Sequence, residues 1–155
     1  MVIAAEVAGA EIGRIRMSPV PDVAARSLER CVRAAISEGS VVHTDGWRRY
    51  SGLKRRGYQH RPKNISASGE PAHEIMPRVH RVASLLKRWW LETHQGAIGH
   101  AILAYYLDEF TFRFNRRPSR SRGMLFYRLL QQALLVESVP YKKLVGGQRL
   151  NENNR

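Results

Sequence analysis

An acid, two aromatic residues and two arginines lie within the six residues Asp45–Tyr50. Val41 and Val42 ahead of them predict a short buried strand, and Thr44-Asp45-Gly46 predicts the turn that ends it. A carboxylate at the mouth of a strand can face solvent or a metal ion. It can equally cap the following segment while Trp47 fills the core, because Asp-Gly pairs at strand ends are common. Both interpretations of Asp45 stay open on this local pattern.

A second candidate group lies in the middle of the chain, where His80, Lys87 and His94 are seven residues apart. Seven residues are two helical turns, so the three side chains share one face of a predicted helix. Phosphoryl-transfer nucleases hold divalent metal between a strand-end Asp and such a polar helix face, and Lys87 would suit a DNA phosphate. The alternative is a solvated basic face. The chain contains no Gly-rich phosphate loop, serine elbow or paired-His zinc helix.

The charge balance is strongly basic, with 26 Lys and Arg against 13 Asp and Glu, a net charge of +13. An excess of this size predicts a polyanionic partner, with nucleic acid as the default and an anionic membrane surface as the weaker alternative. The cations gather in two clusters. The second cluster predicts a nucleic-acid contact or, alternatively, a solvated helix end. The first cluster is Arg48, Arg49, Lys54, Arg55, Arg56, Arg61 and Lys63; the second is Arg113, Arg116, Arg117, Arg120 and Arg122, interleaved with Phe112, Phe114 and Asn115.

The length of 155 residues suits one domain. Cys31 is the single cysteine, which excludes an intrachain disulfide and a Cys-based zinc site. No stretch approaches the roughly 18 apolar residues of a membrane span, and the N-terminus lacks the layout of a signal peptide. These features predict a protein of a reducing cytosol.

In the first half of the chain, predicted strands and a predicted helix follow one another, which indicates an α/β domain. Val2–Val7 and Ile12–Val20 predict a β-hairpin. A helix is expected over Ala24–Ser37, and Gly57–His60 can add one more short strand. Asn64–Pro71 is the most loop-like stretch and predicts a mobile surface loop.

The second half predicts helices. An amphipathic helix begins near Glu74, and a second covers Gly99–Asn115, with Gly96 as the stop signal between them. A third helix is expected over Met124–Leu135, and residues 137–155 predict a flexible polar tail. The side chains expected to face inward on the third helix are Phe126, Leu129, Leu130 and Ala133.

Three blocks form one long ordered pattern over about residues 10 to 135. The blocks are Thr44-Asp45-Gly46-Trp47 with Tyr50, Leu53, Gly57-Tyr58 and His60; His80-Arg81-Val82-Ala83-Ser84-Leu85-Leu86-Lys87-Arg88-Trp89 with Thr93-His94-Gln95-Gly96; and Tyr106-Leu107-Asp108-Glu109-Phe110 with Phe114-Asn115-Arg116-Arg117. The pattern resembles the ISXO-like transposase domain, a DDE-type transposase of bacterial insertion sequences. That resemblance implies a ribonuclease-H-like mixed sheet with flanking helices, which uses Mg²⁺ or Mn²⁺ to cut and rejoin DNA at element ends.

The resemblance also implies roles for single residues. Asp45 matches the second catalytic aspartate, and His80 falls where the third metal-binding group lies on the final helix. Lys87 matches the basic residue that follows that group. The implied partners are transposon-end DNA and further copies of the chain, with no membrane and no small-molecule substrate. The DNA-binding residues expected from both clusters and the helix are Arg48, Arg49, Arg55, Arg56, Lys87, Arg88, Arg113, Arg116 and Arg117.

The main departure from the family pattern is that the opening strand, which carries the first catalytic aspartate, is missing. No acid before Asp45 matches that aspartate. We expect residues 1–136 to be a partial, N-terminally truncated catalytic domain whose sheet lacks a strand beside Val2–Val7 or Val41–His43. One Asp and one neutral His supply too little negative charge for two-metal catalysis, so DNA binding without strand transfer and weak metal uptake are expected. The alternatives are a non-catalytic basic nucleic-acid-binding protein and, more remotely, a small metal hydrolase.

Overall fold

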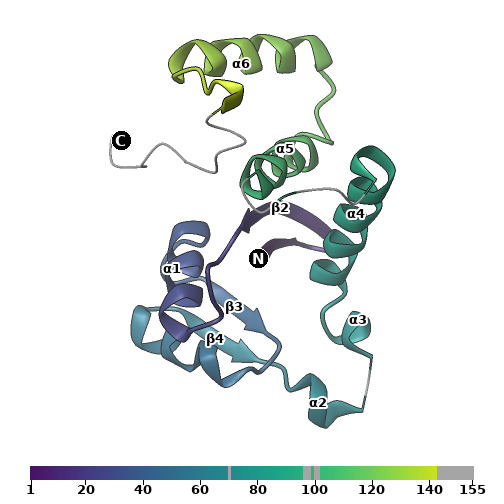
Figure 1. The fold of residues 1–155 in the computed structure, drawn as a ribbon. Helices are drawn as coiled ribbons and strands as arrows, with labels where there is room; N and C mark the ends of the chain where they lie inside the picture. Colours follow the sequence, from purple (N-terminus) through teal and green to yellow (C-terminus); the bar gives the residue numbers. More distant parts are fainter. Residues whose placement is uncertain (70, 96–98, 100–101, 143–155) are drawn as a thin grey trace. The chain divides into compact units, whose positions relative to one another are not determined.

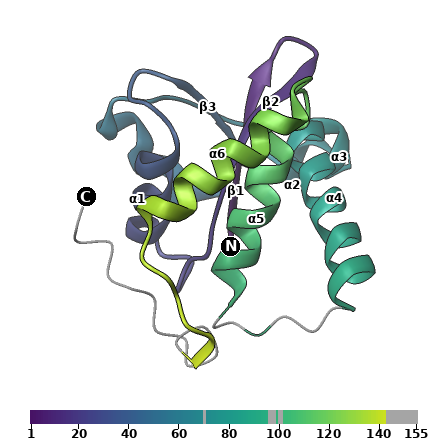
Figure 2. The same cartoon turned by 90° about the horizontal axis from the view of Figure 1, so that it is seen from above.

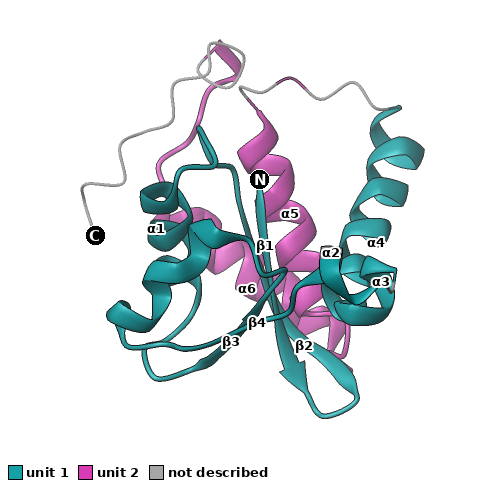
Figure 3. Ribbon diagram, turned by 90° about the horizontal axis from the view of Figure 1, so that it is seen from below, with its two compact units in different colours: residues 1–96 teal, residues 97–155 magenta. Residues whose placement is uncertain are grey.

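The computed structural model describes residues 1–69, 71–95, 99 and 102–142. It divides into two compact units, residues 1–96 and 97–155 (Figure 3). Unit 1 mixes strands and helices, and the described part of unit 2 is helical. The expected α/β class is therefore confirmed. In the described residues, no helix is long and apolar enough to cross a membrane.

Unit 1 opens with the predicted β-hairpin. Strand β1 (Val2–Ala8) pairs antiparallel with β2 (Glu11–Ser18), and the register runs from Val2 opposite Ser18 to Ala8 opposite Glu11. Gly9 at the turn has a φ of 61°, a conformation that glycine adopts without steric cost. The alternating pattern buries Ile15 and Met17 on one face of β2.

A parallel strand pair follows the hairpin. Helix α1 (Ala25–Ala35) precedes β3 (Val41–Thr44), and a 3-10 helix, η1 (Arg48–Arg56), connects β3 to β4 (Gln59–Pro62). Strands β3 and β4 pair in parallel, with Val42 opposite His60. The core of this part is a buried cluster of four side chains that come from α1, β3, η1 and the start of β4: Val32, Val42, Leu53 and Tyr58.

The hairpin and the parallel pair form two separate two-stranded sheets, and Figures 1 and 2 show them as distinct ribbons. Within the described residues β1 pairs only with β2, and β3 pairs only with β4. One edge of β1 and one edge of β3 are thus left without a neighbouring strand. The expected single mixed sheet is thus divided into two, and the missing strand beside Val2–Val7 or Val41–His43 stays a prediction.

The predicted loop Asn64–Pro71 contains one helical turn, α2 (Ile65–Ser68), and a second turn, α3 (Ala72–Ile75), follows it. The side chain of Asn64 caps α2 by accepting a hydrogen bond of 3.2 Å from the backbone N–H of Ala67. This local cap explains why a Ser- and Gly-rich stretch is helical here. The prediction of a loop over Asn64–Pro71 is therefore wrong for Ile65–Ser68, and its mobility stays a prediction.

Helix α4 (Pro77–His94) is the amphipathic helix expected from the sequence, and it contacts β1. Pro77 occupies its first position, where a missing N–H costs nothing. Arg78 ties the helix to the hairpin by donating to the carbonyl oxygens of Gly9 at 2.6 Å and Glu11 at 3.3 Å. The helix ends at Gln95, which takes a left-handed φ of 50°; the predicted stop at Gly96 lies outside the described residues.

Unit 2 contains α5 (Leu103–Asn115) and α6 (Arg122–Leu135), both close to their predicted bounds. Leu107, Phe110 and Phe114 of α5 are buried. The expected inward face of α6 is wrong, because Phe126 is 65% exposed and the described α6 contains no buried residue. An apolar stripe marks a face that could be covered, but it does not supply an element to cover it. Of the predicted tail, residues 143–155 lie outside the described part.

Candidate functional site

Asp45 stands directly after β3, as the sequence predicted, and its side chain is exposed. Gly46 follows with a φ of 80°, and the Asp45 carboxylate Oδ1 accepts a hydrogen bond of 3.1 Å from the backbone N–H of Trp47. This hydrogen bond agrees with the capping interpretation of Asp45, although η1 itself has no side-chain cap. The second half of that interpretation is wrong, because the Trp47 side chain is 41% exposed and does not fill the core.

A shallow pocket of about 510 Å³ opens beside this turn. Its lining comes from the end of β3 and the start of α2, and consists of Asp45, Gly46, Trp47, Arg48, Asn64 and Ile65. One carboxylate, one amide and one guanidinium lie beside the Trp47 indole and the Ile65 side chain, so the lining mixes polar and apolar groups. Such a lining can hold a charged or planar group at the surface.

The strand end is held by a buried polar contact that the sequence patterns did not reveal. Thr44 Oγ1 and His60 Nε2 are 2.9 Å apart, and both residues are buried. Burial lowers the pKa of His60, and the charge of Lys54 lowers it further, so the neutral imidazole is favoured. The backbone N–H of Lys63 also donates to the Thr44 carbonyl oxygen at 2.8 Å. The only sequence signal was that Thr44 and His60 both lie on predicted strands.

Tyr50 links the turn to the core. It packs against the cluster of Val32, Val42, Leu53 and Tyr58 and is half-buried. Burial raises the pKa of the Tyr50 hydroxyl, and the negative charge of Asp45 raises it further. Tyr50 therefore stays protonated and can act as a hydrogen-bond donor beside Asp45.

The structure brings two of the three predicted catalytic residues into one hollow. Asp45 and His80 both line a groove of unit 1 whose volume is about 1060 Å³. His80 is half-buried near the start of α4. Lys87 lies two turns further on, roughly 10 Å along the helix axis, and it is exposed and not part of the groove lining. His94 lies at the end of α4, where its ring meets Trp89 edge-on at 4.8 Å.

The residues present do not fit a Mg²⁺ site. Among the described residues, no group of three or more His, Cys, Asp and Glu side chains could hold a metal ion. Asp45 and His80 offer one carboxylate and one imidazole, whereas Mg²⁺ prefers six oxygen ligands. Glu6 also lines the groove, but its Oε2 accepts a hydrogen bond of 2.8 Å from the backbone N–H of Arg14. The metal roles of Asp45 and His80 remain predictions.

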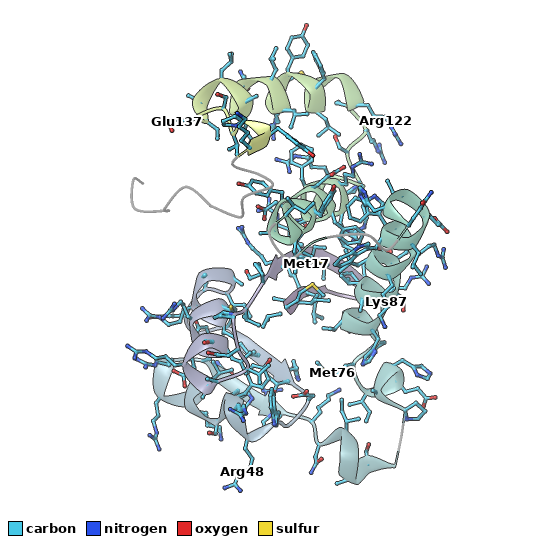
Figure 4. All side chains as sticks on the ribbon, viewed as in Figure 1. Met17, Arg48, Met76, Lys87, Arg122 and Glu137 are labelled. Atoms are coloured by element: carbon cyan, nitrogen blue, oxygen red, sulfur yellow. The ribbon has the colours of Figure 1, made fainter. Side chains whose placement is uncertain are left out.

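The cations around Asp45 differ in what already occupies them. Arg49 stacks over the Trp47 ring at 5.1 Å, and Arg56 Nε donates to Glu29 at 3.1 Å. Arg48 points away from the rest of unit 1 (Figure 4). In the described part of the chain, neither Arg48 nor Arg55 is in an ion pair with an acid. Arg48 and Arg55 are thus better placed for phosphate than Arg56, which sequence analysis grouped with them.

The second arginine cluster lies at the end of α5 in unit 2. Arg113 forms an ion pair with Glu109 at 2.8 Å. Arg116 lies over the Phe112 ring at 3.7 Å, and Arg117 lies over the Phe114 ring at 4.0 Å. Stacking fixes the plane of each guanidinium. Arg117 Nη1 also donates to the Phe114 carbonyl oxygen at 2.9 Å. Phe112 and Phe114, which are interleaved with this cluster in the sequence, therefore also orient these arginines.

The comparison with known families decides the class of the protein. The family model of the ISXO2-like transposase domain matches residues 1–115. The chain belongs to this family. The match covers unit 1 and α5, and it ends before α6. No curated protein and no solved structure matches the chain. The resemblance found in the sequence is confirmed, and the chain is an insertion-sequence transposase by family.

Proposed function

We propose that this transposase chain binds duplex DNA through phosphate contacts made by exposed cations beside Asp45 and along α4. The observation that carries the proposal is that Arg48, Arg55, Lys87 and Arg88 are all exposed on unit 1. No acid of the described chain pairs with any of these four side chains. With a net charge of +13, the chain gains free energy from a polyanion that releases its counterions.

In unit 2 the proposed DNA contacts are Arg116 and Arg117. Their stacking on Phe112 and Phe114 reduces the side-chain entropy that a phosphate contact would otherwise cost. Arg113 and Arg56 are weaker candidates, since each would have to leave a carboxylate first. Arg49 is a candidate of intermediate strength, because it contacts the Trp47 ring but remains exposed.

We further propose that the fold is ribonuclease-H-like and of the DDE class. The order of elements in unit 1 supports this proposal. It runs from an antiparallel hairpin through a helix and a parallel strand pair to a long helix. In this proposal Asp45 and His80 are the second and third metal-binding groups, and Lys87, two turns further along α4, holds a phosphate. The family acts on DNA, so the cytoplasm and its nucleoid are the proposed location.

We propose that residues 1–155 bind DNA but do not cleave it unaided. One carboxylate and one imidazole in the groove fall short of the oxygen ligands that Mg²⁺ requires. Imidazole is better suited to Mn²⁺ or Zn²⁺, so any metal taken up should be bound weakly and with that preference. This donor set also favours the second candidate, a non-catalytic DNA-binding protein of the same family.

The test of DNA binding is fluorescence anisotropy with a labelled duplex at salt concentrations from 50 to 200 mM. If about six phosphates are neutralised, affinity should fall on the order of a thousandfold across this range. Arg48→Ala with Arg55→Ala should lower the slope of log K against log salt by about 2. The matched control is Arg26→Ala with Arg33→Ala, which removes the same charge from exposed positions of α1. Equal losses in the two double variants, or a flat salt dependence, would contradict the proposed surface.

The test of cleavage uses the same duplex, carrying the element's ends, with Mg²⁺ and separately with Mn²⁺. The expected result is binding without nicking by the 155-residue chain, and an unchanged affinity in Asp45→Asn. Nicking that Asp45→Asn abolishes would overturn the proposal of an incomplete donor set. Nicking that Asp45→Asn leaves intact would overturn the assignment of the site.

A further inference from the structure

The groove of about 1060 Å³ in unit 1 has the two unpaired strand edges among its walls. Its lining includes Val2–Val7 of β1 and residues 40–45 around β3. The rest of the lining comes from α1, β2, η1, β4 and the segment from α2 to the first turn of α4. The backbone N–H and C=O groups along such edges form hydrogen bonds readily with another strand.

We propose that this groove binds an extended, acidic segment of a separate polypeptide as an additional β-strand between β1 and β3. Strand addition is a known mode of peptide recognition, in which main-chain hydrogen bonds give affinity and alternate side chains give specificity. The proposal concerns a protein partner of unit 1 and does not depend on the DNA contacts above.

The size of the groove fits one strand. A residue in a packed strand occupies roughly 160 Å³, from a rise of about 3.3 Å, a strand spacing of about 4.8 Å and a sheet spacing of about 10 Å. The groove volume therefore corresponds to about seven residues. Strand β1 itself has seven residues, so the available edge and the available volume agree.

The lining predicts the chemistry of the partner. Its apolar members include Ile3, Val42 and Val79, which favours an occupant that is apolar at alternate positions. The charged members are mostly basic: Arg14, Arg16, Arg61, Lys63 and Arg78 against Glu6 and Asp45. In the described chain, no acid forms an ion pair with any of these five cations. The partner strand should therefore carry Asp or Glu at the positions between its apolar residues.

Duplex DNA is the competing occupant of a basic groove, but two features favour a peptide. The groove is walled by strand edges, whose N–H groups alternate with C=O acceptors that repel phosphate. The phosphate backbone of DNA also has no apolar groups that could pack against the aliphatic side chains of the groove. Both features match an extended polypeptide.

The experiment uses the full 155-residue chain and a fluorescein-labelled peptide of sequence Thr-Val-Asp-Val-Glu-Ile-Thr. The control peptide has the same side chains and charge, but three alternate backbone amides are N-methylated. We expect saturable binding of the first peptide and at least tenfold weaker binding of the second. Amide hydrogen exchange should slow in β1 and β3 when the first peptide binds, and should not change in α6.

Cysteine cross-linking locates the peptide independently of affinity. In a Cys31→Ser background, Ala4→Cys in the groove should form a disulfide with a peptide that carries Cys at its centre. Glu38→Cys, at an exposed position outside the groove lining, is the matched control and should not. Equal cross-linking at both positions would overturn the proposal.

Three further results would overturn the proposal. The first is equal affinity for the N-methylated peptide, and the second is displacement of the peptide by a short duplex at stoichiometric concentration. The third is a chain that is already dimeric, with β1 and β3 protected before peptide is added, since a second copy would then fill the groove. The DNA-binding proposal is tested separately, because the effect of Arg48→Ala with Arg55→Ala on DNA affinity is measured without peptide. A failure of the peptide experiments therefore leaves the DNA-binding proposal standing.

Discussion

Gly46→Ala should destabilise the chain more than a glycine substitution at another left-handed position. Gly46 has a φ of 80°, where an L side chain costs about 1–2 kcal/mol. A Cβ atom there would also lie 3.0 Å from Asn64 Cα and 3.1 Å from the Lys63 carbonyl oxygen. Those atoms are backbone, and the Lys63 N–H is held to the Thr44 carbonyl oxygen at 2.8 Å. Relief therefore requires a backbone shift beside Asp45.

The magnitude follows from adding the two effects. Overpacking against fixed neighbours costs typically 1–3 kcal/mol, so Gly46→Ala should lower the free energy of unfolding by about 2–5 kcal/mol. Gly39→Ala is the matched control, because Gly39 has a φ of 83° and no atom within 4 Å of the added Cβ. That control should cost only the conformational strain, about 1–2 kcal/mol.

Urea unfolding of the full chain, followed by far-UV circular dichroism, measures both variants. Asparagine tolerates the left-handed region, so Gly39→Asn should recover much of the loss, whereas Gly46→Asn should not because its Cβ meets the same backbone. If Gly46→Ala costs no more than Gly39→Ala, the close approach of the Asp45 turn to Asn64 is not as described.

The remaining predictions concern the interior of unit 1. His60 is expected to make stability pH-dependent: burial lowers its folded pKa below the ordinary 6.5, so its contribution is complete above pH 6.5 and is lost as the pH falls towards the folded value. Urea titrations between pH 7.5 and 5 should therefore show a steeper decline for the wild type than for His60→Gln. Leu53→Ala should cost about 2–5 kcal/mol because Leu53 is 0% exposed. Leu91→Ala, at a side chain that is 65% exposed, should change the free energy of unfolding by less than about 0.5 kcal/mol.

Local sequence patterns were sufficient for most individual elements. Alternation in Ile12–Val20 predicted β2, and the spacing of apolar residues after Glu74 predicted α4. Gly46 at the end of β3 indicated a turn with positive φ, which the structure has. These features depend on residues two to four apart, whose interactions are set by the backbone itself. The motif blocks likewise sufficed for the family, since they required only order along the chain.

Features that depend on distant residues were decided by tertiary structure. Arg56 is paired with Glu29, which lies 27 positions away, and Thr44 is bonded to His60, 16 positions away. No local pattern could separate Arg56 from its unpaired neighbour Arg55. The side chain of Trp47 is exposed because its neighbours in space leave it uncovered, although its type favours burial.

The candidate site shows the same division. The sequence by itself determined that Asp45 ends a strand, that His80 and Lys87 share a helix, and that the chain is strongly basic. Only the tertiary structure placed Asp45 and His80 on one groove, left Lys87 outside it, and separated the strands into two sheets with an open edge on each. The physical reason is that strand pairing and groove formation depend on which surfaces meet after the chain folds back, and helical or strand periodicity carries no information about that meeting.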